Sequence, residues 1–169
     1  MNTKNLPEEK KQVTLAIGIL LIATCLRAPF TSLGPLLEIV QDSLSLSTTA
    51  TGFVNALPLL AFAAVSPIVP LLNKKMGMEP ALGIAITLVG GGVALRSLGY
   101  IWSLYAGTTL IGCGIAICNV LLPSLVKRDF PETIPRLTAF YALTMGISAA
   151  LGSALMVPVA KTLGWGWEL

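Results

Sequence analysis

The chain has 169 residues, of which 54% are hydrophobic and 11% are charged, and its formal net charge is +3 at pH 7. Soluble domains carry about 25% charged residues, so this composition cannot cover a water-facing surface of this size. Nucleic-acid binding is not indicated, because the basic residues lie in short runs without interleaved aromatic residues. We therefore predict an integral membrane protein that binds no nucleic acid, with a very apolar soluble bundle as the alternative.

The apolar residues gather into five blocks, each long enough for a helix to cross a bilayer, which takes about 20 residues. Short stretches between the blocks hold most of the charged and turn-forming residues. This pattern predicts an all-α, polytopic membrane helix bundle of about five transmembrane helices, preceded by a cytoplasmic tail at residues 1–12. The predicted spans are residues 13–40, 49–72, 80–98, 103–126 and 137–160.

Basic residues indicate the orientation, because cytoplasmic loops collect lysine and arginine. They precede the first predicted span and follow the second and the fourth, which places the N-terminus in the cytoplasm. Lys127 and Arg128, after the fourth span, are interpreted as a topological anchor. Two residues depart from the pattern: Lys161 follows the fifth span, and Arg96 lies at the outer end of the third span. We expect its side chain to extend to the lipid headgroups, with a functional role as the alternative.

Arg27 is the most informative residue, because it lies roughly halfway along the first apolar block. A charge at that depth costs at least about 2.5–3.5 kcal/mol on insertion scales, and such charges mark solute pathways or bundle interiors. Thr31 falls on the same stripe of the predicted helix. A guanidinium presents a planar fork of donors, suited to small anions and polar heteroaromatic rings. The alternatives for Arg27 are an internal ion pair or contacts with backbone carbonyl groups.

The second, fourth and fifth predicted spans each carry a face that mixes hydrogen-bonding side chains with small or kink-permitting residues. Such a face points toward protein or water in preference to lipid. For each of these polar residues the alternative is hydrogen bonding between helices. The predicted solute-binding residues are Arg27, Thr31, Asn55, Asn119 and Tyr141.

No group of residues typical of an enzyme is present in the sequence. It contains no histidine, no spacing typical of metal ligands, and no serine or cysteine beside a plausible base. Cys25, Cys113 and Cys118 lie inside apolar blocks and are interpreted as packing residues. We therefore predict a protein that is not an enzyme and has no catalytic site, no metal site and no cofactor.

The segment Leu26–Leu37, LRAPFTSLGPLL, resembles the first-helix signature of the cyanate permease family of the major facilitator superfamily. Residues 56–62 resemble the second helix of that family, and residues 114–131 resemble its fourth helix and the following loop. Residues 144–154 resemble the fifth helix of its 2-nitroimidazole transporter branch.

The resemblance implies a secondary transporter of two six-helix halves that works by alternating access. It implies that this chain is the N-terminal portion, in a bacterial inner membrane. The implied partners are the lipid bilayer, the missing second half, and a small solute such as a cyanate-like anion or a nitroimidazole-like heteroaromatic. One feature of the superfamily is missing. Its loop between helices two and three usually carries an Asp that takes part in gating, and the corresponding segment here, Lys74–Gly77, has no Asp. The alternative from another class is a non-transporting membrane scaffold, or a truncation product that needs a partner chain.

Overall fold

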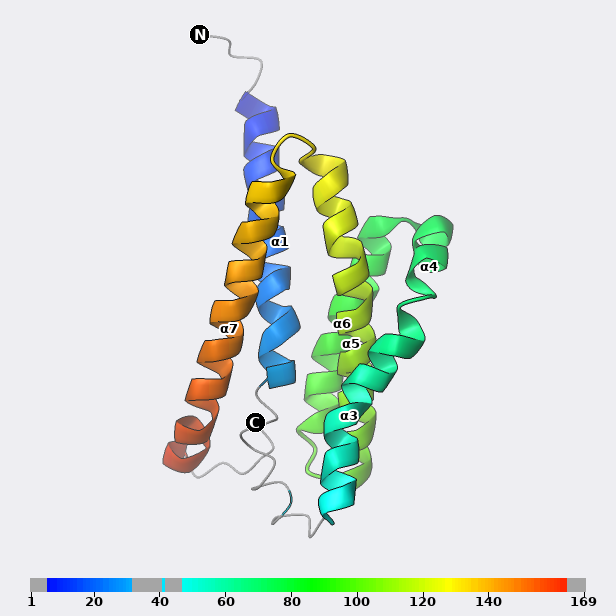
Figure 1. The fold of residues 1–169 in the computed structure, drawn as a ribbon, viewed down its shortest axis with the longest axis vertical. Coiled ribbons are helices and arrows are strands. Elements are labelled where there is room, and N and C mark those ends of the chain that lie inside the picture. Colours follow the sequence, from blue (N-terminus) through cyan, green and yellow to red (C-terminus); the bar gives the residue numbers. More distant parts are fainter. Residues whose placement is uncertain (1–5, 32–40, 42–46, 164–169) are drawn as a thin grey trace.

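The computed structural model describes residues 6–31, 41 and 47–163 (Figure 1). Within these residues all regular structure is helical, which confirms the predicted all-α fold class. The helices are α1 (Leu6–Thr31), α3 (Thr48–Val65), α4 (Val69–Met76), α5 (Met78–Arg96), α6 (Ile101–Asp129) and α7 (Ile134–Leu163).

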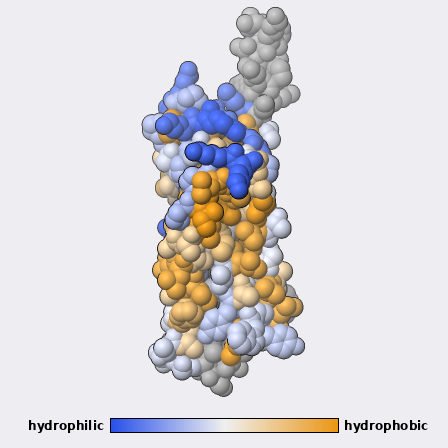
Figure 2. All heavy atoms as spheres, turned by 90° about the vertical axis from the view of Figure 1, so that its right-hand side faces the viewer, coloured by the Kyte–Doolittle hydropathy of each residue, from blue (hydrophilic) through white to orange (hydrophobic). Residues whose placement is uncertain are grey.

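Four of the described helices contain a segment long and apolar enough to cross a membrane. A shorter apolar stretch, Gln12–Arg27, lies in α1. Figure 2 shows hydrophobic residues along much of one face and hydrophilic residues gathered at one end of the molecule. The chain is therefore a multi-pass membrane protein. The four segments are Thr48–Val65, Met78–Arg96, Ile101–Asp129 and Ile134–Leu155.

Helices α5, α6 and α7 correspond to the predicted spans 80–98, 103–126 and 137–160, with bounds that differ by two or three residues. The first predicted span, 13–40, is described only as far as Thr31, where α1 ends, and the remainder lies outside the described residues.

The second predicted span, 49–72, is broken in the structure, where a turn at residues 66–68 separates α3 from α4. Pro67 accounts for the break, because proline has no backbone N–H to donate and its ring clashes with the preceding turn of a helix. Around it the backbone N–H of Ser66 bonds the Phe62 carbonyl, and that of Ile68 bonds the Val65 carbonyl at 2.9 Å. The predicted span therefore consists of a long helix followed by a short one.

The helices form two groups (Figure 1). Helices α1 and α7 pack side by side, and α6 packs against both α5 and α3. Glycines permit the close approach of α5 and α6. A Cβ on Gly107 would lie 2.6 Å from the Gly92 carbonyl oxygen, and one on Gly114 would lie 2.6 Å from the Ala85 carbonyl oxygen. No side chain fits at these two positions unless the helices move apart.

Arg96 corrects the expectation from the sequence. Its side chain was predicted to extend to the lipid headgroups, but the residue is only 4% exposed. The cause is again Gly107, because a Cβ there would lie 2.8 Å from the Arg96 backbone nitrogen and 3.0 Å from its Cβ. Helix α6 thus covers the last turn of α5, and the arginine lies within the protein.

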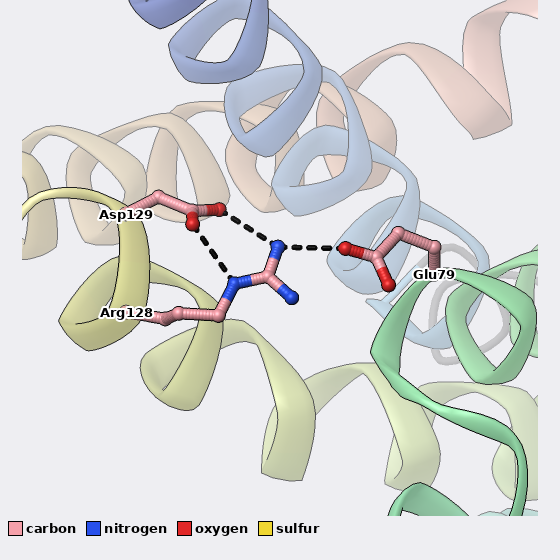
Figure 3. Close-up of polar contacts among 3 residues, drawn as sticks. All are labelled: Glu79, Arg128 and Asp129. Carbon is pink, nitrogen blue, oxygen red and sulfur yellow. Dashed lines mark hydrogen bonds and ion pairs between the residues drawn. The ribbon is translucent and has the colours of Figure 1, made fainter.

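An ion pair joins the start of α5 to the end of α6 (Figure 3). Nη2 of Arg128 lies 2.7 Å from Oε1 of Glu79, and Nε of Arg128 lies 2.8 Å from Oδ1 of Asp129. The side chains of Arg128 and Glu79 are 45% and 68% exposed, so water and salt screen their attraction. Arg128, interpreted from the sequence as a topological anchor, therefore also links two helices.

Candidate functional site

The candidate site is a cavity of about 320 Å³ between the two helix groups. Side chains from α1 and α7 form one wall, and side chains from α3 and α6 form the other. The lining residues are Leu26, Arg27, Pro58, Leu59, Phe62, Gly112, Ile115, Asn119 and Met145.

The wall made by α3 and α6 depends on Gly112. A Cβ at this position would lie 2.8 Å from the Pro58 Cα, 2.9 Å from the Pro58 carbonyl oxygen and 3.0 Å from the Ala61 Cβ. Only glycine allows the two backbones to come this close. The contact places Pro58 and Phe62, one helical turn apart, next to Ile115 and Asn119 on α6.

The opposite wall is fixed by a hydrogen bond between α7 and α1. The Ser148 hydroxyl donates to the Thr24 carbonyl oxygen at 2.9 Å, and Ser148 is 8% exposed. Ser148 follows Met145 by one helical turn, and Thr24 precedes Arg27 by one turn. The bond therefore sets the position of Met145 relative to Arg27. Arg27 itself is exposed at the cavity.

Within the described part of the chain, Arg27 and Asn119 are the two polar side chains that line the cavity. Arg27 brings a permanent positive charge with five N–H donors. Asn119 is half-buried, and its Nδ2 donates to the Ile115 carbonyl oxygen at 3.1 Å. The remaining surface is apolar, with one aromatic ring from Phe62 and one thioether from Met145. Such a cavity suits a small solute with a polar edge and an apolar face.

The five predicted solute-binding residues have different placements. Arg27 and Asn119 line the same cavity. Asn55 is exposed on α3, one turn before Pro58, and is not among the lining residues. Tyr141 is partly buried and packs against the hydrophobic core, one turn before Met145. Thr31 is the last residue of α1, and its side chain lies outside the described part of the chain.

Sequence reasoning did not assign binding roles to the apolar lining residues. Phe62 and Met145 follow Pro58 and Tyr141 by one turn, so the helical period places them on the polar faces that were recognised. Leu26, Leu59 and Ile115 carry no such signal, because an isolated leucine or isoleucine looks the same in a cavity, in a core or against lipid.

A second groove, between the N-terminal parts of α3 and α6, is lined almost entirely by apolar and aromatic side chains. Phe53 and Tyr105 meet there with ring centroids 6.3 Å apart. Its described lining residues offer no charged side chain, and their polar groups are the hydroxyl groups of Tyr105 and Thr109 and the indole N–H of Trp102. The cavity with Arg27 is therefore the better candidate for a polar solute.

The Major Facilitator Superfamily model matches residues 19–169. Over 159 residues the chain is 50% identical to the 2-nitroimidazole transporter of Escherichia coli (strain K12). This alignment covers 94% of this chain and 40% of that protein. It is 43% identical to the uncharacterized transporter YycB of Bacillus subtilis (strain 168), over 96% of this chain and 41% of that protein.

A more distant relative is the cyanate transport protein CynX of Escherichia coli (strain K12), 25% identical over 92% of this chain and 42% of that protein. The chain thus spans about 40% of the length of the curated relatives it matches. No solved structure matches it significantly.

Proposed function

The chain belongs to the major facilitator superfamily, and from this premise we propose that it is the N-terminal portion of a secondary transporter for a small anionic or polar solute. Two of its relatives are named for the transport of 2-nitroimidazole and of cyanate. The solute we propose is therefore a cyanate-like anion or a nitroimidazole-like heteroaromatic.

The observation that carries the proposal is the position of Arg27 in the cavity. A charge within a membrane-spanning region is costly, and it is retained where it faces a solute pathway or a protein partner. The cavity volume of about 320 Å³ corresponds to roughly ten water molecules at about 30 Å³ each, which is room for a small ring. The guanidinium offers two parallel N–H donors to a carboxylate-like, nitro or cyanate group.

In the proposed mechanism the cavity opens alternately to the two sides of the membrane. Arg27 binds the acceptor group of the solute, and Asn119 contacts it from α6. Thr31, Asn55 and Tyr141 are proposed to contact the solute along its path or in another conformation. A second half of the transporter would provide the facing wall. We place the N-terminus in the cytoplasm, following the distribution of basic residues. We place the protein in the bacterial inner membrane, following its resemblance to the family.

The test is solute uptake by cells that express the full reading frame containing this chain, with 2-nitroimidazole and cyanate as probes. Arg27→Ala should lower uptake about tenfold or more at an unchanged level in the membrane. Arg27→Lys should also impair uptake, because an ammonium lacks the planar fork. Arg136→Ala is the matched control, since Arg136 is an exposed arginine near the start of α7 and is not among the residues that line the cavity.

Wild-type uptake by the Arg27→Ala variant would refute the role of Arg27. If the wild-type protein transports neither probe, the proposed transport of these solutes is wrong, and the scaffold alternative becomes the better interpretation.

A further inference from the structure

The side-chain amide of Asn119 has a defined orientation in the cavity, with its nitrogen and its oxygen in different positions. Its Nδ2 donates to the Ile115 carbonyl oxygen at 3.1 Å. The opposite assignment would bring Oδ1 against that carbonyl, and two acceptors cannot form a hydrogen bond. Oδ1 is therefore the atom directed away from the α6 backbone, and it accepts no hydrogen bond from the residues that the structure describes.

Among the lining residues that the structure describes, Asn119 alone carries a strong side-chain acceptor, its Oδ1. Arg27 carries only donors, and the thioether of Met145 is a weak acceptor. The other lining side chains are hydrocarbon, apart from Gly112, which has none. A solute that fills the cavity displaces water from Oδ1, and an acceptor that loses water without gaining a donor is costly.

We propose that Asn119 makes the cavity selective for solutes that carry an N–H or O–H donor in addition to an acceptor group. This inference rests on the proposed transport function and extends it to the solute class. Arg27 receives the acceptor or anionic group, and Asn119 Oδ1 receives the donor. The surfaces of Pro58, Phe62 and Met145 contact the apolar body between the two groups. A flat azole-type ring with a ring N–H has both groups, whereas a cyanate-like anion has only acceptors.

The size of the selectivity follows from the exposure of Asn119. Sites with fully buried polar groups reject an analogue that lacks one hydrogen-bonding group by about 10⁴–10⁵-fold. Asn119 is only half-buried, so water can still reach the amide and reduce the penalty. We expect discrimination of about 5- to 100-fold, the range for one partly desolvated acceptor left without a donor.

The experiment compares uptake of 2-nitroimidazole and 1-methyl-2-nitroimidazole into vesicles that contain the protein from the full reading frame. The pH is kept where the ring nitrogen of 2-nitroimidazole is protonated, and uptake into protein-free vesicles is subtracted. The wild-type protein should take up the N–H compound at least about fivefold faster. Asn119→Leu should bring the ratio close to one, because the methylated compound no longer leaves Oδ1 without a donor and the N–H compound loses its acceptor.

A second variant, Asn119→Thr, tests the inference even if Asn119→Leu does not fold. In this structure Thr87 and Thr109 bond the carbonyl oxygens of Gly83 and Tyr105, four residues earlier, at 2.9 and 2.8 Å. Asn119→Thr should bond the Ile115 carbonyl oxygen in the same way, so it keeps this bond. Its shorter side chain holds the hydroxyl oxygen against the helix backbone, which withdraws the acceptor from the position of Oδ1. Its ratio should also fall toward one. Thr109→Val, ten residues from Asn119 on the same helix, is the control and should keep the wild-type ratio.

Three results would overturn the inference. Equal wild-type uptake of both compounds above the vesicle background would remove the selectivity and leave the proposed transport function in place. An unchanged ratio in both Asn119 variants would show that the methyl group is excluded by its size and not by Asn119. Uptake of neither compound by the wild-type protein would remove the transport function and the inference together.

Discussion

Substitution of Gly107 by alanine should test whether the contact between α5 and α6 holds the bundle together. An added Cβ would lie 2.6 Å from the Gly92 carbonyl oxygen, about 0.8 Å closer than an ordinary contact of 3.4 Å. The neighbouring atoms are two backbone atoms of α5 and the Cβ of Arg96, and none of them can move away by rotation of a side chain. The two helices must separate or tilt, and overpacking of this kind costs about 1–3 kcal/mol.

The matched control is Gly91→Ala in α5, where an added Cβ would meet nothing within 4 Å. Both substitutions add one methyl group inside a helix, and each gains about 0.8–1.0 kcal/mol of helix propensity. Their difference in the free energy of unfolding therefore isolates the packing cost of about 1–3 kcal/mol. Thermal denaturation in mild detergent, with the folded fraction measured by size-exclusion chromatography, gives the comparison. A Gly107→Ala protein as stable as Gly91→Ala would refute the glycine-dependent packing.

Two further predictions concern contacts between helices. Ser148→Ala removes the buried hydrogen bond to the Thr24 carbonyl oxygen and should lower the free energy of unfolding by about 0.5–1.5 kcal/mol, measured by the same denaturation assay. Ser124→Ala, at an exposed position, should change little, and equal losses in the two variants would contradict the role of Ser148. Glu79→Gln removes the exposed ion pair with Arg128, so its small effect on Tm should shrink as salt rises from 50 mM to 1 M. A salt-independent difference would mean that the carboxylate acts through something other than its charge.

Hydropathy predicts the helices well because a bilayer requires long apolar segments with internally satisfied backbone groups. It did not predict the break between α3 and α4, although Pro67 is visible in the sequence. Pro58 and Pro123 remain inside α3 and α6, so proline alone does not mark the end of a helix here. Which proline ends a helix depends on the contacts around it, and a single sequence does not contain them.

The same limit applies to Arg96. Its position near a helix end predicts a side chain that reaches the headgroups, and the error arose because rotation and separation of helices are tertiary properties. Gly107 provides the close approach that buries Arg96, and it is eleven residues away along the chain. A glycine in a span is compatible with a close contact or with open space, as Gly107 and Gly91 show.

The candidate site was partly predictable. Arg27 and Asn119 stand out because polar side chains are costly in apolar spans, and the structure places both at one cavity. The apolar lining was not predictable from periodicity alone. Leu59 is 60% exposed and lines the cavity, while Leu60 is 54% exposed beside it and does not. The two leucines are adjacent in α3, and only the packing of α3 against α6 determines which of them lines the cavity.

The break after Val65 also limits how thick a membrane the bundle can occupy. With 18 residues at about 1.5 Å each, α3 is about 27 Å long, slightly less than a hydrocarbon layer of about 30 Å. Helix α6, with 29 residues, is about 43 Å long and must extend into the aqueous phase or tilt. Of the four described segments that could span a membrane, α3 is the shortest, so it sets the local thickness of the lipid. Bilayers with longer acyl chains should thin around this face of the protein, and such mismatch costs fractions of a kcal/mol per Å.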